Sequence, residues 1–340
     1  MRLTFVRIAL LAGVLATGCG GSGSSSETTP EKLTSAPPPS LPLPTDPWAV
    51  IPDGASSAVS VDVVALRGSP HADFLKQWGR AAGCLRPEHE ALLFDRTELA
   101  LGASWPEKEG VAPALAVLKG AYTEADTQTV LDAYAAIMRS AQAPVTEQQH
   151  GRIRVLKRGA AAAARIGEGL LVLGTAAEVE SAALFAEGSK AARLYDGELL
   201  TSTGARDELA ANAIVLVGVA SEAIQKRAGR SLGAVGMPRD LLSGTLLGLL
   251  KLSDGGAQVE ARVRKASPEA AASTANAIQS KLGQLSLLAR LAGLPRVLEQ
   301  TQVRANGDVL QVALSASQTD IMALRERMQD VLADTSACTP

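Results

Sequence analysis

Histidine, cysteine and carboxylate side chains are the residue types in this chain that could bind a metal ion or transfer a proton. The chain has only three histidines, at His71, His89 and His150. The densest group of such residues brings Cys84 together with Glu88, His89 and Glu90, yet the sequence contains neither an HExxH nor a CxxC motif. The pattern predicts a solvated turn around Pro87 and no metal site.

Motifs for covalent catalysis and for phosphate binding are missing from the sequence that follows the first fifty residues. A serine hydrolase of the nucleophile-elbow type needs Gly-x-Ser-x-Gly, and a penicillin-recognising enzyme needs Ser-x-x-Lys. Neither the Walker pattern nor Gly-x-Gly-x-x-Gly occurs either, so the sequence predicts no nucleotide cofactor. A triad can be assembled from residues distant in sequence, so an anchored hydrolase with a dispersed active site stays open as an alternative.

The N-terminus has the pattern of a secretory signal peptide, which we place at residues 1–18. Arg2 and Arg7 supply positive charge, residues 8–16 are an apolar run, and the small residues Thr17 and Gly18 follow. The apolar run is much shorter than the roughly 20 residues that span a bilayer. We therefore expect export and cleavage, not a permanent transmembrane helix.

The cleavage region Leu15-Ala16-Thr17-Gly18-Cys19 resembles the lipobox of bacterial lipoproteins. The resemblance implies that Cys19 becomes the lipidated N-terminus and carries more than one acyl chain, such as palmitate. Its acyl chains would then be the membrane partner, because two or more chains give stable anchoring where one gives marginal binding. Gly20 stands where the family's inner-membrane members carry Asp, which favours the outer membrane over the inner membrane within the cell envelope.

A flexible tether follows the lipidation site and occupies residues 19–47. From Gly20 to Ser26 it contains only Gly and Ser, and its second part is rich in Thr, Ser and Pro. The remaining chain is long enough for one large domain or two ordinary ones. We expect a first half at 48–190, a connection at 191–211 and a second half at 212–340.

The two halves repeat one order of elements. In the first half the patterns predict strands and helices at 58–64, 70–83 (helix), 97–104, 114–121, from 123 onward (helix), 152–157, 160–166, 170–173 and 176–186 (helix). In the second half they predict 213–220, 221–229 (helix), 244–252, 258–265, from 267 onward (helix), 298–304, 309–314 and 318–332 (helix). Hairpins interrupt any alternation of strands with helices, so we expect an α+β fold of antiparallel sheets with helices on one face, built by tandem duplication.

Cys84 and Cys338 remain once Cys19 is set aside as the lipid site. Outside the cytoplasm two nearby thiols tend to oxidise, so the pair is our disulfide candidate, and two free thiols are the alternative. In the loop-entropy model a bridge across so long a loop stabilises by about 5 kcal/mol.

Composition narrows the functional classes. The 33 basic residues nearly cancel the 35 acidic ones to give a net charge of −2, and only 3% of residues are aromatic. Nucleic-acid binding needs clustered cations or stacking platforms, so we expect no nucleic-acid partner. The phrases Ile51-Pro52-Asp53-Gly54-Ala55 and Leu66-Arg67-Gly68-Ser69-Pro70 resemble the opening of exported bacterial proteins of unknown function, and that resemblance implies no catalytic residues.

Our hypothesis from the sequence is a membrane-anchored envelope lipoprotein whose folded part is a non-catalytic binding or structural module. Its partner would be an envelope protein, an envelope component or a small apolar ligand. The other two hypotheses are the anchored hydrolase and a carrier of a small apolar ligand, which would need a dry cavity.

Overall fold

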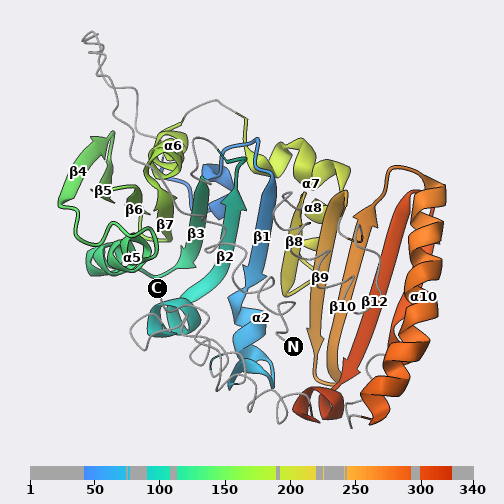
Figure 1. Cartoon of the computed structure of the whole chain (residues 1–340). Coiled ribbons are helices and arrows are strands. Elements are labelled where there is room, and N and C mark those ends of the chain that lie inside the picture. The colour runs from blue at the N-terminus through green and yellow to red at the C-terminus, as the bar shows by residue number, and fades with distance from the viewer. Residues whose placement is uncertain are drawn as a thin grey trace. The chain divides into compact units, whose positions relative to one another are not determined.

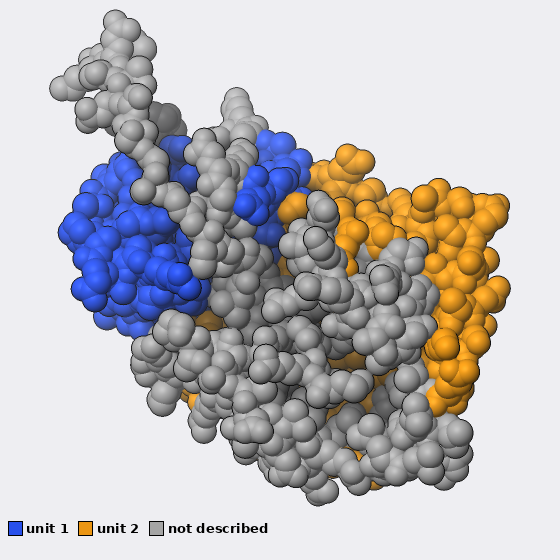
Figure 2. Space-filling model, in the orientation of Figure 1, with its two compact units in different colours: residues 1–55, 102–194 blue, residues 56–101, 195–340 orange. Residues whose placement is uncertain are grey.

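The computed structural model describes residues 42–73, 76, 90–107, 113–188, 192–219, 225, 241, 243–291 and 299–323. The chain divides into two compact units, and each is discontinuous in sequence (Figure 2). Unit 1 comprises residues 1–55 and 102–194, and unit 2 comprises residues 56–101 and 195–340. The division expected at 48–190, 191–211 and 212–340 follows the order of elements along the chain, and it stays a prediction.

Unit 1 is built on an antiparallel sheet with the strand order β3-β7-β6-β5-β4 (Figure 1). Its elements are η1 (Pro47–Val50), β3 (Ala114–Gly120), α5 (Glu124–Ile137), β4 (Val145–His150), β5 (Ile153–Arg158), β6 (Ala161–Ile166), β7 (Leu170–Thr175) and α6 (Ala176–Ala186). The strands from β4 to β7 follow one another as a meander, so each pairs with its neighbour in sequence.

Helices cover both faces of the unit 1 sheet. Successive strand residues point to opposite faces. Lys157 of β5 forms an ion pair with α6 through Glu180, whereas the next residue, Arg158, pairs with Asp132 of α5 at 3.0 Å. In β6 the four alanines 161–164 are all 0% exposed. Small side chains let a helix approach on each side, so this sheet differs from the expected arrangement with helices on one face.

The start of α5 follows from its cap. The backbone N–H of Thr123 donates to the Asp126 carboxylate over 2.6 Å, which satisfies a donor at the helix entry. An acidic first turn also suits the positive end of the helix dipole. On the buried face of α5 lies Tyr134, which is 2% exposed and whose hydroxyl has no hydrogen-bond partner among the described residues.

Unit 2 has an antiparallel sheet with the strand order β11-β12-β10-β9-β8-β1 (Figure 1). Its elements are β1 (Ser57–Asp62), α2 (Val63–Gly68), η2 (Ala91–Arg96), α7 (Glu198–Ser202), α8 (Ala205–Glu208), β8 (Ile214–Val219), β9 (Thr245–Ser253), β10 (Gly256–Arg264), α10 (Pro268–Leu291), β11 (Gln302–Asn306) and β12 (Val309–Ser317). Two further elements contain the positions at which the chain is divided, namely β2 (Thr97–Ser104) and η3 (Leu194–Asp196).

The two faces of the unit 2 sheet differ in polarity. Along β10 the even-numbered residues from Gln258 to Arg264 are polar, and the odd-numbered residues from Ala257 to Val263 are apolar. On the apolar face α10 packs against β11 and β12, where Ile278 and Val263 belong to one buried cluster. On the polar face the short helices α7 and α8 contact β8.

One connection recurs in both units. In unit 1, α5 follows β3, and the last strand of the meander, β7, returns to pair with β3 and carries β6 on its other side. In unit 2, α10 follows β10, and β12 returns to pair with β10 and carries β11 on its other side. In both units, therefore, a strand is followed by a helix, and a later strand returns to pair with the first strand. This connection is the part of the expected repeat that can be seen in the strand pairing. The α+β class and antiparallel pairing are confirmed.

Several expected boundaries differ from the structure. The strand expected at 58–64 ends at Asp62, because the Asp62 carboxylate accepts from the Ala65 N–H at 2.8 Å and starts α2. A strand at Val145–His150 was not expected, and β11 begins at Gln302, later than the expected 298. The connection 191–211 contains η3, α7 and α8. The helix expected at 318–332 begins at 318 and is described as far as 323, whereas the helices expected at 70–83 and 221–229 fall largely outside the described residues.

Candidate functional site

The three cysteines singled out from the sequence lie outside the described residues. Cys19 with its tether, Cys84 and Cys338 therefore stay predictions for lipidation and for a disulfide. His89 also lies outside, while His71 is 7% exposed and His150 ends β4. Among the residues that the structure describes, no three His, Cys, Asp or Glu side chains gather where they could hold a metal ion.

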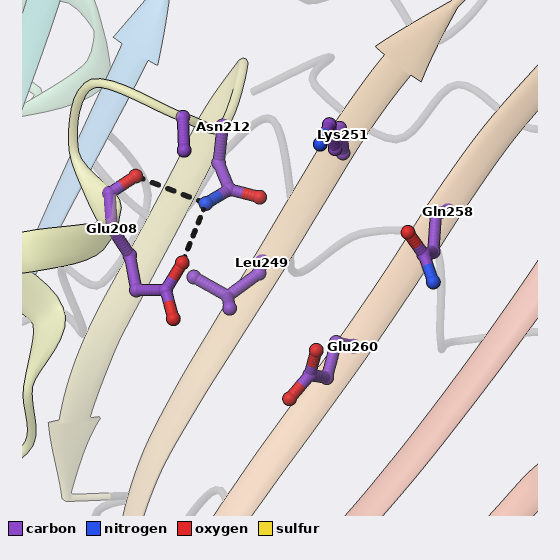
Figure 3. Close-up of a pocket in the computed structure, with 7 residues that line it drawn as sticks. Glu208, Asn212, Leu249, Lys251, Gln258 and Glu260 are labelled. Atoms are coloured by element: carbon purple, nitrogen blue, oxygen red, sulfur yellow. Dashed lines mark hydrogen bonds between the residues drawn. The ribbon is translucent and has the colours of Figure 1, made fainter.

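A polar pocket lies on the sheet of unit 2, beside α8 and over β9 and β10 (Figure 3). It has a volume of about 170 Å³ and is open to solvent on one side. Its lining is made up of Glu208, Ala211, Asn212, Leu249, Lys251, Gln258 and Glu260. Carboxylate, amide and amino groups therefore dominate the lining, and Leu249 is its one large apolar side chain.

Strand alternation places these groups on one face. Gln258 and Glu260 are two residues apart on β10, so their side chains leave the sheet on the same side. The register pairs Gln258 with Lys251 and Glu260 with Leu249 on β9. Glu208 ends α8 and reaches the same face from beyond β8. The pocket thus depends on the register of β9 and β10 and on the docking of α8.

Arg262 fixes the carboxylates beside the pocket. Its guanidinium forms an ion pair with Glu208 over 2.8 Å and a short hydrogen bond with Glu260, the residue two positions earlier on the same strand. The hydrogen bond to Glu260, and after it the one to Glu208, raises the pKa of Arg262 above its ordinary value. These contacts hold three charged side chains of two elements in one arrangement.

Two amides complete this network. The side-chain amide of Asn212 donates to the Glu208 carboxylate at 3.0 Å and to the Glu208 carbonyl at 2.9 Å, as Figure 3 shows. The side-chain amide of Gln311, on β12, donates to Glu260 at 2.7 Å. Both carboxylates are thus engaged as acceptors by neighbouring side chains, an arrangement that suits binding better than proton transfer to a substrate.

The side chains of Lys251 and Gln258 are exposed and have no hydrogen-bond or ion-pair partner in the part of the chain that the structure describes. They face each other across β9 and β10 in the register. A cationic donor and a neutral amide therefore stand side by side at the pocket without internal partners. This pair can contact an anionic or carbonyl group of a ligand.

Sequence reasoning did not find this pocket. Lys251 falls within the strand expected at 244–252, and Glu208 falls within the connection expected at 191–211. The available signal was the polar alternation of Gln258, Glu260 and Arg262 along a strand. No helix among the described residues combines the length and the apolar character needed to cross a membrane.

Comparisons with known proteins give a limited result. No protein-family model matches the sequence, and no curated protein matches it significantly. Among solved structures the chain is similar to crystal forms I, III and IV of TP0453, with TM-scores of 0.47, 0.46 and 0.45 and identities of 13%, 12% and 13%. The matches cover 83%, 83% and 85% of this chain and 96%, 97% and 97% of those chains. Values this low do not support the transfer of a function.

Proposed function

We propose that this protein is a lipid-anchored component of a bacterial cell envelope whose folded part is a non-catalytic binding module. The N-terminal sequence supports the anchor, because a signal-peptide pattern leads directly into a lipobox-like Cys19 and a Gly/Ser tether. The observation that carries the binding role is the polar pocket of unit 2, where a fixed charged network lies beside Lys251 and Gln258, whose side chains have no partner among the described residues. The membrane that holds the acyl chains of Cys19 is, in this proposal, the outer membrane.

The chemistry of the pocket favours one class of ligand. Its two carboxylates are balanced by Arg262 and Lys251, so it offers separated charges with no large net charge. A small polar molecule, or a polar part of an envelope component, would place an anionic group on Lys251 and a carbonyl or amide on Gln258. An apolar ligand finds little matching surface here, because Leu249 is the one large apolar side chain in the lining.

The anchor is tested by fractionating cells that express the full-length chain or its Cys19→Ser variant. We expect the wild type in the membrane fraction with acyl chains on the mature N-terminus, and the variant unprocessed or soluble. Cys84→Ser is the matched control, and it should fractionate like the wild type. Membrane attachment of Cys19→Ser equal to that of the wild type would contradict the anchor.

The binding role is tested by native mass spectrometry of the protein released gently from its own envelope. We expect a non-covalent adduct on the wild type that disappears under denaturing conditions. Lys251→Ala should lose the adduct, while Lys281→Ala, which removes a partly exposed lysine of α10 outside the pocket, should keep it. A bare mass for the wild type, or an adduct that Lys251→Ala retains, would reject the pocket as the binding site.

A further inference from the structure

The strand β4 forms the outer edge of the unit 1 sheet. Among the described strands it pairs with β5 alone, and it stands last in the strand order, at the left of Figure 1. Residues 145–149 are all exposed. An edge of this kind presents unpaired N–H and C=O groups, and proteins usually protect such an edge with Lys, Pro or a bulge. The sequence Val-Thr-Glu-Gln-Gln-His contains no Lys and no Pro, it pairs with β5 without a bulge, and Glu147 is its one acidic side chain.

The hairpin fixes which backbone groups face outward. His150 pairs with Ile153 across the turn at Gly151, whose φ is +56°, so this pair closes the hairpin with reciprocal hydrogen bonds. Alternate residues along β4 then turn their N–H and C=O groups toward β5 or away from it. The residues that turn them away are Val145, Glu147 and Gln149.

We propose that β4 pairs antiparallel with β4 of a second copy of this chain, so that the unit 1 sheets of two molecules join across a two-fold axis. Antiparallel pairing requires that residues whose N–H and C=O groups point outward lie opposite each other. The two-fold axis must then pass through one residue position shared by both strands, and not between two positions. Centring on Glu147 would set two carboxylates directly opposite each other, which is unfavourable. Centring on Gln148 places Glu147 opposite Gln149 of the partner and joins them by reciprocal backbone hydrogen bonds.

The neighbouring strand supports this register. Arg154 of β5 forms ion pairs with Glu147 at 2.8 Å and with Glu124 at 2.9 Å, so one cation is shared by two carboxylates. Glu147 is held in place but keeps part of its negative charge, which favours the neutral Gln149 of a second copy opposite it. Lys157 donates a short hydrogen bond to the side-chain oxygen of Gln148, which leaves the Gln148 amide NH₂ free to donate across the axis. The two Gln148 side chains would therefore meet as donor and acceptor in both directions. This inference is independent of the polar pocket.

Cross-linking of the full-length protein in its membrane tests the register. Facing residues at a non-hydrogen-bonded antiparallel pair have Cα atoms about 4.5 Å apart, close enough for a disulfide. We expect Gln148→Cys to give a covalent dimer on a non-reducing gel under mild oxidation, well above the wild-type background from the native cysteines. Thr146→Cys, on the same side of the same strand, should stay at background. In the proposed register it lies opposite position 150 of the second copy, four residues away from the second copy's position 146.

Two further variants keep the proposal falsifiable. Gln149→Lys sets a cation opposite Glu147 of the partner and should tighten the dimer about fivefold, whereas Gln149→Glu should weaken it by a similar factor, as measured by sedimentation in detergent. Gln302→Cys, on the exposed edge strand β11, is the control for random collision and should not cross-link above background. Background cross-linking for Gln148→Cys, or equal cross-linking for Thr146→Cys, would overturn the proposal.

Discussion

Removing Arg262 should destabilise unit 2, and the size of the effect follows from its surroundings. Arg262→Met keeps the length of the side chain but leaves Glu208 and Glu260 without their shared cation. The side chains of Arg262, Glu208 and Glu260 are 34%, 25% and 19% exposed, respectively. Breaking a fully buried pair costs about 3–5 kcal/mol, and an exposed pair contributes about 1 kcal/mol or less. Because water screens this partly exposed network, we expect a loss of about 2 kcal/mol.

Urea denaturation of the wild type and the variant measures this loss as a change in the free energy of unfolding. Glu260→Gln and the double variant complete a double-mutant cycle, and we expect the double variant to lose less than the sum of the two single variants. Arg264→Met is the matched control on the same strand, because Arg264 is 53% exposed and its nitrogen lies 3.6 Å from Asp308. A loss for Arg262→Met no larger than that of the control, or strict additivity in the cycle, would refute the reasoning.

Three further substitutions test packing and burial. Gly174→Ala places a Cβ 2.2 Å from the Ala114 carbonyl oxygen, so we expect a loss of more than about 2 kcal/mol in the free energy of unfolding, measured by urea denaturation. Tyr134→Phe removes a buried hydroxyl that has no partner within the described part of the chain, and it should stabilise by about 1 kcal/mol at pH 7. Burial raises the pKa of Tyr134 to about 12, so the wild type should lose stability as pH rises above 10 and the variant should lose less. Burial lowers the pKa of His71, so stability should fall as pH drops below about 6.5, and thermal melts of His71→Leu should show a smaller fall.

The sequence was informative wherever one short signal decides a boundary. The helix of α6 was predicted with its observed bounds, Ala176–Ala186, because an apolar strand ends there and a run of helix-forming residues begins. The strand β6 was recognised although its alanines are weak strand formers, because turns bracket it on both sides.

Other features depend on partners that the sequence does not display. The strand β4 has no buried face, so its residues lack the apolar alternation by which strands are recognised. The helix α2 follows its strand without a break, and the β-branched Val63 and Val64 favoured continuing that strand. The pocket arises from contacts between Glu208 and Arg262, which meet only after α8 docks and the strands align.

The discontinuity of unit 2 sets the order in which the chain can fold. Unit 1 takes most of its sheet from the β4–β7 meander, whose contacts are local and can form as soon as residues 145–175 are available. The strand β1 instead pairs with β8, so Ser57 must wait for Gly218. β1 is also the neighbour of β2 in the strand order, so a chain that emerges from its N-terminus can pair β1 with β2 early. The other edge of β1, a strand that carries the apolar Val59 and Val61, stays open until β8 follows unit 1. In that interval the open edge of β1 can pair with another chain, so it is a site of aggregation during folding.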